Sequence, residues 1–223
     1  MRRTRRFTIA AALGMSTALA VGCSTKIVAP PPVDEPPAAS SPAGAVQRFA
    51  WGFNHKDVEV VSGLLSDDFQ FISAGTDSAG NPSRAPYDRS WFLVALAALR
   101  DSSSTVSFMV DQNLVPFPDT RPGKVSKYHE QIRTSVHASV RFTDPNGNVE
   151  ITGSLLFFLT RGDSAAIPAD LRALGLKPDS TQWWLDRMED ETLAGAGVSY
   201  PARPSRNNTF GGLLEYFHSL VAH

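Results

Sequence analysis

The sequence predicts an α+β domain in which three helices precede a long antiparallel sheet. Apolar residues recur with the period of a helix in three segments between residues 42 and 100. Between residues 105 and 190, apolar and polar residues alternate in several segments, as they do in half-buried strands. This order is typical of the α+β class, and residues 41–191 are enough for one domain with its own core.

The first two predicted helices lie within residues 42–65. Pro42 suits a first helical turn, and Ser41 before it can cap the helix. Asp57 can cap the second helix. The apolar faces of the two helices are Val46, Phe49, Ala50 and Phe53, then Val58, Val61, Leu64 and Leu65. We expect residues 66–68 to stop the second helix and a strand to follow, with Phe69, Phe71 and Ser73 on one of its faces.

Residues 74–87 are rich in Gly, Ser and Pro, which predicts a loop that serves either as a binding loop or as plain surface. Asp88 or Ser90 can cap a third helix over residues 91–100. A strand is expected over residues 105–115, where Val106, Phe108 and Val110 share one face. Three prolines make residues 116–124 a loop.

The clearest predicted strand covers residues 127–142, and residues 149–161 return beside it after a turn. The core face of the first strand is Tyr128, Ile132, Val136, Ala138, Val140 and Phe142. In the turn, Gly147 is free to adopt a positive φ. We predict a four-residue loop that pairs Thr143 with Asn148, since it places Val140 opposite Ile151 and keeps apolar residues together. A three-residue loop would mix polar and apolar residues on both faces.

The outer face of this hairpin predicts a homodimer. It carries Arg133 and His137 on one strand and Leu156 and Phe158 on the other. Leu156 and Phe158 would be exposed in a monomer, so we expect a second copy of the chain to cover them.

The remaining segments complete the domain and extend beyond it. A short inserted helix is expected over residues 168–174 and a closing strand over residues 181–190. Residues 192–223 form a linker and a short amphipathic helix. The apolar residues of this helix are Phe210, Leu213, Leu214, Phe217, Leu220 and Val221. The helix either docks on the domain or contacts a partner or a membrane surface, and Gly211 and Gly212 weaken it.

The N-terminus carries a targeting segment over residues 1–22. Four arginines precede an apolar stretch that is short for a membrane span and ends at small residues. The end, Ala20-Val21-Gly22-Cys23, resembles a bacterial lipobox. The resemblance implies cleavage before Cys23 and acylation of Cys23, which would hold the protein to membrane lipid. An ordinary secretory signal with an incidental cysteine is the alternative.

The segment after the targeting sequence predicts a tether and the cellular location of the domain. Residues 23–40 are rich in proline and form an extended tether. Because Ser24 follows the cysteine, we expect the outer membrane of a bacterial envelope, with the domain facing the periplasm or the cell surface.

Loss of four arginines with the signal leaves 17 of 21 basic residues against 22 acidic ones, a net charge of about −5. With no basic cluster among aromatic residues, the chain is not expected to bind nucleic acid.

Residues 45–73 resemble the opening of the nuclear transport factor 2-like superfamily, which includes ketosteroid isomerases and SnoaL-like polyketide cyclases. The resemblance rests on Val46-Gln47-Arg48-Phe49, Asn54, Asp57 and Asp67-Asp68, at the spacings of the first two helices of the isomerases. It implies a sheet that curls around the helices into a cone with a pocket. The residues expected to line the pocket are Phe49, Phe53, Phe71 and Phe108, which lie on the core faces of their elements.

The resemblance does not extend to the chemistry of the isomerases. Phe49 stands where they carry an oxyanion-binding tyrosine, and Ser73 where they carry the catalytic base. The isomerases carry a second oxyanion donor, a protonated aspartate, near the position of Leu155 or Leu156, and this chain has no acidic residue there. We therefore assign no catalytic residue.

No cofactor or metal ion is expected. The sequence has no phosphate-binding or zinc motif, and His129 and His137 on one strand face lie about 26 Å apart. We expect an envelope lipoprotein with a non-catalytic domain that binds a small apolar ligand or a protein. The alternatives are a lyase, isomerase or cyclase that uses the cone pocket, and a structural dimerisation module.

Overall fold

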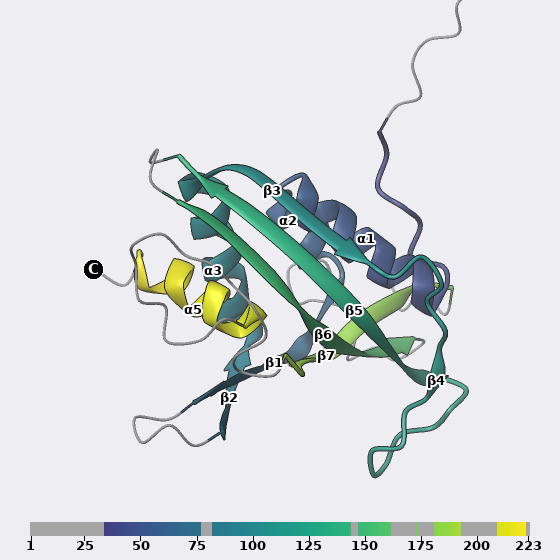
Figure 1. The fold of residues 1–223 in the computed structure, drawn as a ribbon. Helices are drawn as coiled ribbons and strands as arrows, with labels where there is room; N and C mark the ends of the chain where they lie inside the picture. Colours follow the sequence, from purple (N-terminus) through teal and green to yellow (C-terminus); the bar gives the residue numbers. More distant parts are fainter. Residues whose placement is uncertain are drawn as a thin grey trace, which may run out of the picture. The chain divides into compact units, whose positions relative to one another are not determined.

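The computed structural model describes residues 34–76, 82–143, 147–161, 173, 181–192 and 209–221. The chain divides into two compact units, 1–34 and 35–223, and the second carries the fold. Its elements are α1 (Pro42–Asn54), α2 (Val58–Ser62), β1 (Leu65–Thr76), β2 (Pro82–Asp88), α3 (Arg89–Ser102), β3 (Ser103–Val110), β4 (Phe117–Pro118), β5 (His129–Phe142), β6 (Asn148–Arg161), β7 (Trp183–Asp190) and α5 (Phe210–Ser219) (Figure 1). All but Ala173 of the expected inserted helix lies outside the described residues.

The three early helices begin after capping residues that the sequence predicts, although α3 starts at Arg89, two residues before the predicted range. The side chains of Ser41, Asp57 and Asp88 accept hydrogen bonds from backbone amides three residues on, at 3.0, 2.9 and 2.8 Å. These contacts satisfy amides that have no partner inside a helix. The second helix is shorter than expected: it ends at Ser62, and residues 66–68 already lie in β1.

The sheet has seven strands in the order β2-β1-β7-β6-β5-β3, and β4 adds to β5 beyond the end of β3. The predicted antiparallel sheet is correct except that β1 runs parallel to β7. The prediction of a loop over residues 74–87 is wrong, since β1 continues to Thr76 and β2 returns beside it, with Phe71 opposite Tyr87. Two strands therefore precede the third helix. Pro86 is tolerated in β2 because β2 is an edge strand.

The β5–β6 hairpin has the predicted faces but not the predicted register. Val140 lies opposite Val149 and Ala138 opposite Ile151, a shift of two residues. The amide of Phe142 donates to the carbonyl of Gly147 at 3.0 Å, so the turn closes one residue earlier than expected. A side chain on Gly147 would lie 2.7 Å from the Phe142 ring, and the expected positive φ at Gly147 is not observed. Glycine is present for this close approach.

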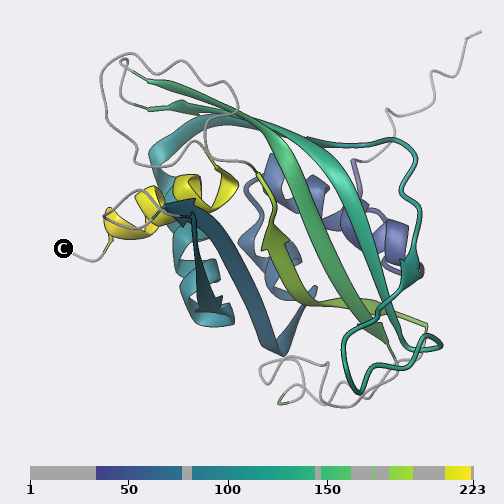
Figure 2. The same ribbon diagram turned by 60° about the horizontal axis from the view of Figure 1, so that its bottom comes forward.

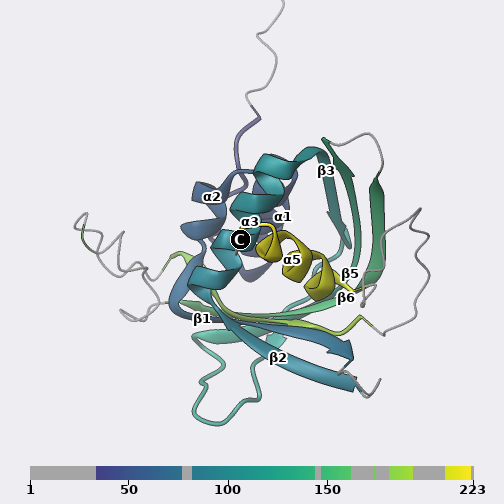
Figure 3. The same ribbon diagram turned by 90° about the vertical axis from the view of Figure 1, so that its left-hand side faces the viewer.

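The sheet curves around the helices (Figures 2 and 3). Figure 3 shows α1, α3 and α5 on its concave side, with β1 and β2 below them and β3, β5 and β6 beside them. This arrangement is the cone that the sequence resemblance implies. Among the described residues, no helix has both the length and the apolar character needed to cross a membrane.

Candidate functional site

Four phenylalanines were predicted to line a pocket, and three of them, Phe49, Phe53 and Phe108, pack on one another inside the cone. Phe49, Phe53, Phe71 and Phe108 are buried. The ring centroid of Phe49 lies 6.1 Å from that of Phe53 and 5.7 Å from that of Phe108. Asn54 fixes Phe108 from the end of α1, because its side-chain amide donates to the Phe108 carbonyl at 2.9 Å and accepts the Phe108 N–H at 2.5 Å. The two distances between ring centroids are those of aromatic side chains in contact.

A fifth ring, from the C-terminal helix, lies at the centre of this group. Phe210 lies 5.5 Å from Phe53, 5.5 Å from Phe108 and 6.1 Å from Phe71, measured between ring centroids. Phe210 begins α5, which Figure 3 shows between α3 and the strands β5 and β6. Docking of this helix on the domain, one of its two predicted roles, is confirmed. The helix thereby buries the Phe210 ring against three of these phenylalanines.

Asp190, the last residue of β7, holds the first turn of α5. One carboxylate oxygen accepts the Gly211 N–H at 2.7 Å and the other accepts the Thr192 N–H at 2.9 Å. Thr209 caps the same turn by accepting the Gly212 N–H at 3.0 Å. Burial raises the pKa of Asp190 above its ordinary value, although hydrogen bonds from Thr192 and Gly211 oppose the change. The carboxyl group therefore lies in a site where its charged form is disfavoured.

A second polar contact joins α5 to β1 and β2. Ser73 donates to a carboxylate oxygen of Glu215 at 2.8 Å, and the Tyr87 hydroxyl donates to the same oxygen at 3.0 Å. Burial, together with the nearby charge of Glu215 and its hydrogen bond, raises the pKa of Tyr87 to about 12. Ser73, at the position of the isomerase base, is engaged with the helix that closes the cone.

Stacked aromatic rings extend the contact between α3 and α5. The Tyr87 and Trp91 rings lie 3.7 Å apart and nearly parallel, and the His218 ring lies 4.9 Å from Trp91. The far end of α5 thus also contacts α3.

The residues predicted for a dimer interface lie on the outer face of the sheet, but they are not equally exposed. Arg133 pairs with Glu191, with its Nε 2.7 Å from a carboxylate oxygen, and His137 lies 3.1 Å from the Thr152 hydroxyl. Leu156 is half-buried. Phe158, which was expected to be exposed, is only 5% exposed. The guanidinium carbon of Arg121 lies 4.0 Å from the centre of its ring.

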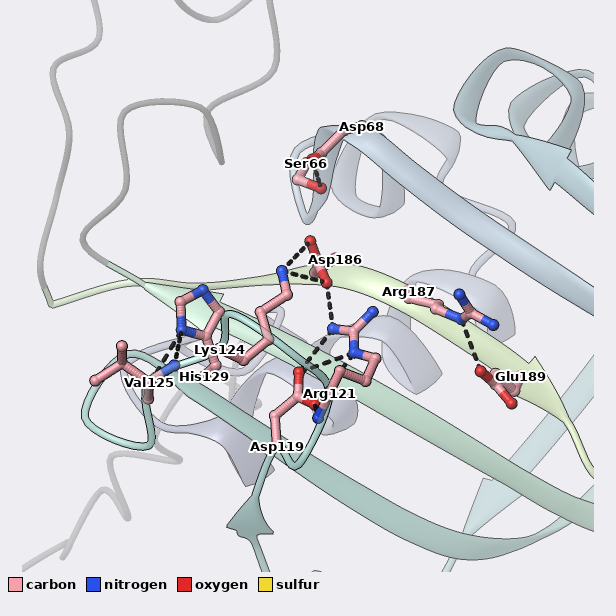
Figure 4. Close-up of polar contacts among 10 residues, drawn as sticks. All are labelled: Ser66, Asp68, Asp119, Arg121, Lys124, Val125, His129, Asp186, Arg187 and Glu189. Carbon is pink, nitrogen blue, oxygen red and sulfur yellow. Dashed lines mark hydrogen bonds and ion pairs between the residues drawn. The ribbon is translucent and has the colours of Figure 1, made fainter.

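Arg121 belongs to an ionic cluster that sequence analysis did not find (Figure 4). It lies between Asp119 and Asp186, and pairs with both. Lys124 adds a contact of 3.2 Å to Asp186. Although burial alone would raise it, the hydrogen bonds and charge of Arg121 lower the pKa of Asp119 below its ordinary value. The cluster fixes the connection between β4 and β5 over Phe158.

Other predicted sites are not brought together. Cys23 lies outside the described residues. Leu155 is fully buried. His129 bonds within its own turn to Val125 and stays apart from His137. Within the described ranges, no three His, Cys, Asp or Glu side chains gather as a metal site would require.

The sequence signals for Asp190, Gly211 and Glu215 are weak. An acidic residue at the end of the last strand and a glycine pair at a helix start occur in many proteins. Only the packing of α5 on the sheet gives these residues a common role.

The fold is similar to that of several solved structures. A protein from Novosphingobium aromaticivorans, provisionally assigned as a scytalone dehydratase, is 16% identical with a TM-score of 0.50, over 75% of this chain and 89% of that chain. A conserved protein from Planctomyces limnophilus is 17% identical with a TM-score of 0.45, over 66% and 89%. A nuclear transport factor 2-like superfamily protein from Salmonella enterica serovar Typhimurium is 13% identical with a TM-score of 0.42, over 71% and 92%.

The similarity to the Novosphingobium aromaticivorans structure supports the class of fold. The chain has the nuclear transport factor 2-like fold that residues 45–73 predicted. At these identities the likeness extends to the fold alone. The sequence matches no family model and no curated protein.

Proposed function

We propose that the chain is a bacterial envelope lipoprotein whose cone domain binds a small apolar ligand or an apolar protein segment and does not catalyse a reaction. The observation that carries the binding role is the position of Phe210. Its ring enters the aromatic interior from a separate C-terminal helix. Without this ring, Phe53, Phe71 and Phe108 would surround an apolar concavity of the kind that binds small molecules.

The residues at the isomerase positions support a non-catalytic role. Phe49 has no hydroxyl group, and Ser73 does not take up a proton near neutral pH. Leu155 is buried and offers no hydrogen-bond donor from its side chain. A proton transfer between carbon atoms needs both a base and stabilisation of the developing oxyanion.

An enzyme of the lyase, isomerase or cyclase type is the second candidate. Asp190 favours it, because a buried carboxyl group with a raised pKa is a common acid or base. In that function α5 must leave before a substrate reaches Asp190. A purely structural dimerisation module is the third candidate, and the packed interior favours it.

Binding of N-phenyl-1-naphthylamine, a small apolar dye, separates these functions. The protein is made soluble by starting it at Glu35, the first residue of the compact unit. We expect saturable binding, tighter in Phe210→Ala because the competing ring is gone. Phe217→Ala is the matched control, since Phe217 lies on the same helix but contacts Phe142 and Tyr216. If neither the folded wild type nor Phe210→Ala bound the dye, the structural module would replace the binding domain.

An activity assay tests the non-catalytic part. Turnover of a 3-oxo-Δ5-steroid should not exceed the rate in buffer. A rate well above it would show that Phe49 and Ser73 have been misinterpreted.

Labelling tests the lipid anchor. The wild type should incorporate labelled palmitate in a bacterial host, and Cys23→Ser should remain an unacylated precursor. Equal labelling of the two proteins would contradict an anchor at Cys23.

A further inference from the structure

Four large apolar side chains are exposed in the connection between β3 and β5. They are Val115, Phe117, Val125 and Tyr128, and we call them the apolar tip. Phe117 and Val125 are 57% and 55% exposed. Single exposed apolar residues are ordinary on a surface, whereas four of them occur in the connection 111–128. The pairing of Phe117 with Gln131 and the ion pairs of Arg121 fix this connection on the sheet.

Basic and aromatic side chains lie together beside the apolar tip. The Lys127 ammonium group lies 5.1 Å from the centre of the Tyr128 ring, and Arg161 lies 4.9 Å from the Trp183 ring. Arg161 joins the two pairs, because its backbone N–H donates to the Tyr128 carbonyl at 3.0 Å. Tyrosine, tryptophan, lysine and arginine are the residues that favour the headgroup region of a bilayer.

The chain enters the domain at this same end. The carbonyl of Ala39 accepts the Trp183 N–H at 2.8 Å, and the carbonyl of Pro37 accepts from Arg48 at 3.2 Å. Figures 1 and 2 show the start of α1 and β4 at one end of the sheet. Ala39 lies sixteen residues after Cys23. A proline-rich segment of that length reaches at most about 50 Å, so an anchored lipid keeps this end of the domain within that distance of the bilayer.

We infer that the apolar tip docks on the lipid bilayer that holds the anchor. This inference rests on the proposed acylation of Cys23. Phe117 and Val125 enter the boundary between headgroups and acyl chains, while Lys127 and Arg161 face the lipid phosphates. Because the mature chain is acidic, apolar insertion next to the anchor, and not long-range attraction, drives the contact.

The test uses the full acylated protein in vesicles of phosphatidylethanolamine and phosphatidylglycerol. Since acylation blocks the thiol of Cys23, the chain's one cysteine, Val125→Cys supplies a single free thiol for a bimane label. With lipids brominated on their acyl chains, the label should lose about half of its emission, because residues in this boundary lie about 5–10 Å deep. Thr105→Cys is the matched control: it is exposed, lies opposite Arg141 at the other end of β5, and should keep its emission.

Mass measurement of the same samples separates the two proposals. An unacylated protein that does not stay with the vesicles would contradict the lipid anchor. An acylated protein whose label at position 125 keeps its emission would overturn docking alone. Phe117→Ser, at an exposed position that leaves the fold intact, should restore emission from the label. Unchanged quenching in this variant would also overturn the inference.

Discussion

Gly211 of α5 lies directly against Ser73 of β1. A β-carbon on Gly211 would come within 2.0 Å of the Ser73 hydroxyl oxygen and 3.0 Å of the Ser73 α-carbon. No side chain larger than hydrogen fits there unless the helix moves. The glycine therefore allows α5 to approach closely enough for Phe210 to enter the cone.

Gly211→Ala should release α5. Helix propensity favours alanine by about 1 kcal/mol, but overpacking typically costs about 1–3 kcal/mol and decides the sign at such a short distance. We expect a lower free energy of unfolding in urea and tighter binding of the apolar dye. Gly212→Ala, on the same turn, should not destabilise the protein. A Gly211→Ala protein as stable as the wild type would show that α5 is not held against Ser73.

Asp190 should make the attachment of α5 depend on pH. Its folded-state pKa is raised, so the folded state binds the proton more tightly than the unfolded chain. Its contribution to stability is thus fully present below the ordinary pKa of about 3.8 and is lost as pH rises through the folded-state pKa. Asp190→Asn removes this titration and also one hydrogen-bond acceptor, at a cost of about 1–3 kcal/mol at every pH.

Urea unfolding of both proteins between acidic and neutral pH measures this effect. The wild type should lose stability relative to Asp190→Asn as pH rises. Distant groups such as Asp119, whose pKa is lowered, titrate alike in both proteins and cancel in the difference. A wild type that gained relative stability with rising pH would mean that the pKa of Asp190 is lowered.

Local signals account for the parts of the fold that the sequence predicted. Ser41, Asp57 and Asp88 each act within three residues of their own position, so the helix starts follow from local chemistry. Strand faces follow from alternation. The register between β5 and β6 does not follow from alternation, because a shift of two residues leaves every side chain on the same face. In the observed register Gly147 lies against the Phe142 ring, a contact that alternation alone does not predict.

Long-range contacts account for the parts that sequence analysis missed. Asp190 and Gly211 are 21 residues apart, and Ser73 and Glu215 are 142 residues apart. The burial of the four phenylalanines was predicted correctly, because apolar character alone predicts burial, while their role as the lining of a pocket stays a prediction. That a fifth ring fills the space between them depends on where α5 docks. The local pattern of α5 only shows that it is amphipathic.

Arg121 should stabilise the outer face through two buried carboxylates. Arg121→Ala leaves Asp119 and Asp186 without this partner and uncovers Phe158. Breaking a fully buried pair costs about 3–5 kcal/mol, and we expect about 2–3 kcal/mol because the Arg121 side chain is a quarter exposed. Urea unfolding measures the loss. Arg100→Ala, which breaks an exposed pair with Asp101, is the control and should change little. Equal effects of the two variants would mean that the cluster is not stabilising.

The covered position of Phe158 changes how the predicted homodimer should be tested. A charge at Phe158 would disrupt the cluster above it, so the loss of a dimer in such a variant would be ambiguous. Leu156 is half-buried on the same face, beside Arg133. Met109 is 55% exposed and lies opposite His137, which extends the apolar part of the face. We predict a homodimer that covers Leu156, Arg133 and His137.

Light scattering on the soluble protein, with Leu156→Asp as the test variant, decides this prediction. The wild type should have the mass of a dimer at micromolar concentrations, and folded Leu156→Asp should have the mass of a monomer, because a buried unpaired charge is costly. Val94→Asp places the same charge at an exposed apolar position on α3 and should leave the dimer intact. A monomeric wild type, or a dimer that persists in folded Leu156→Asp, would exclude this interface.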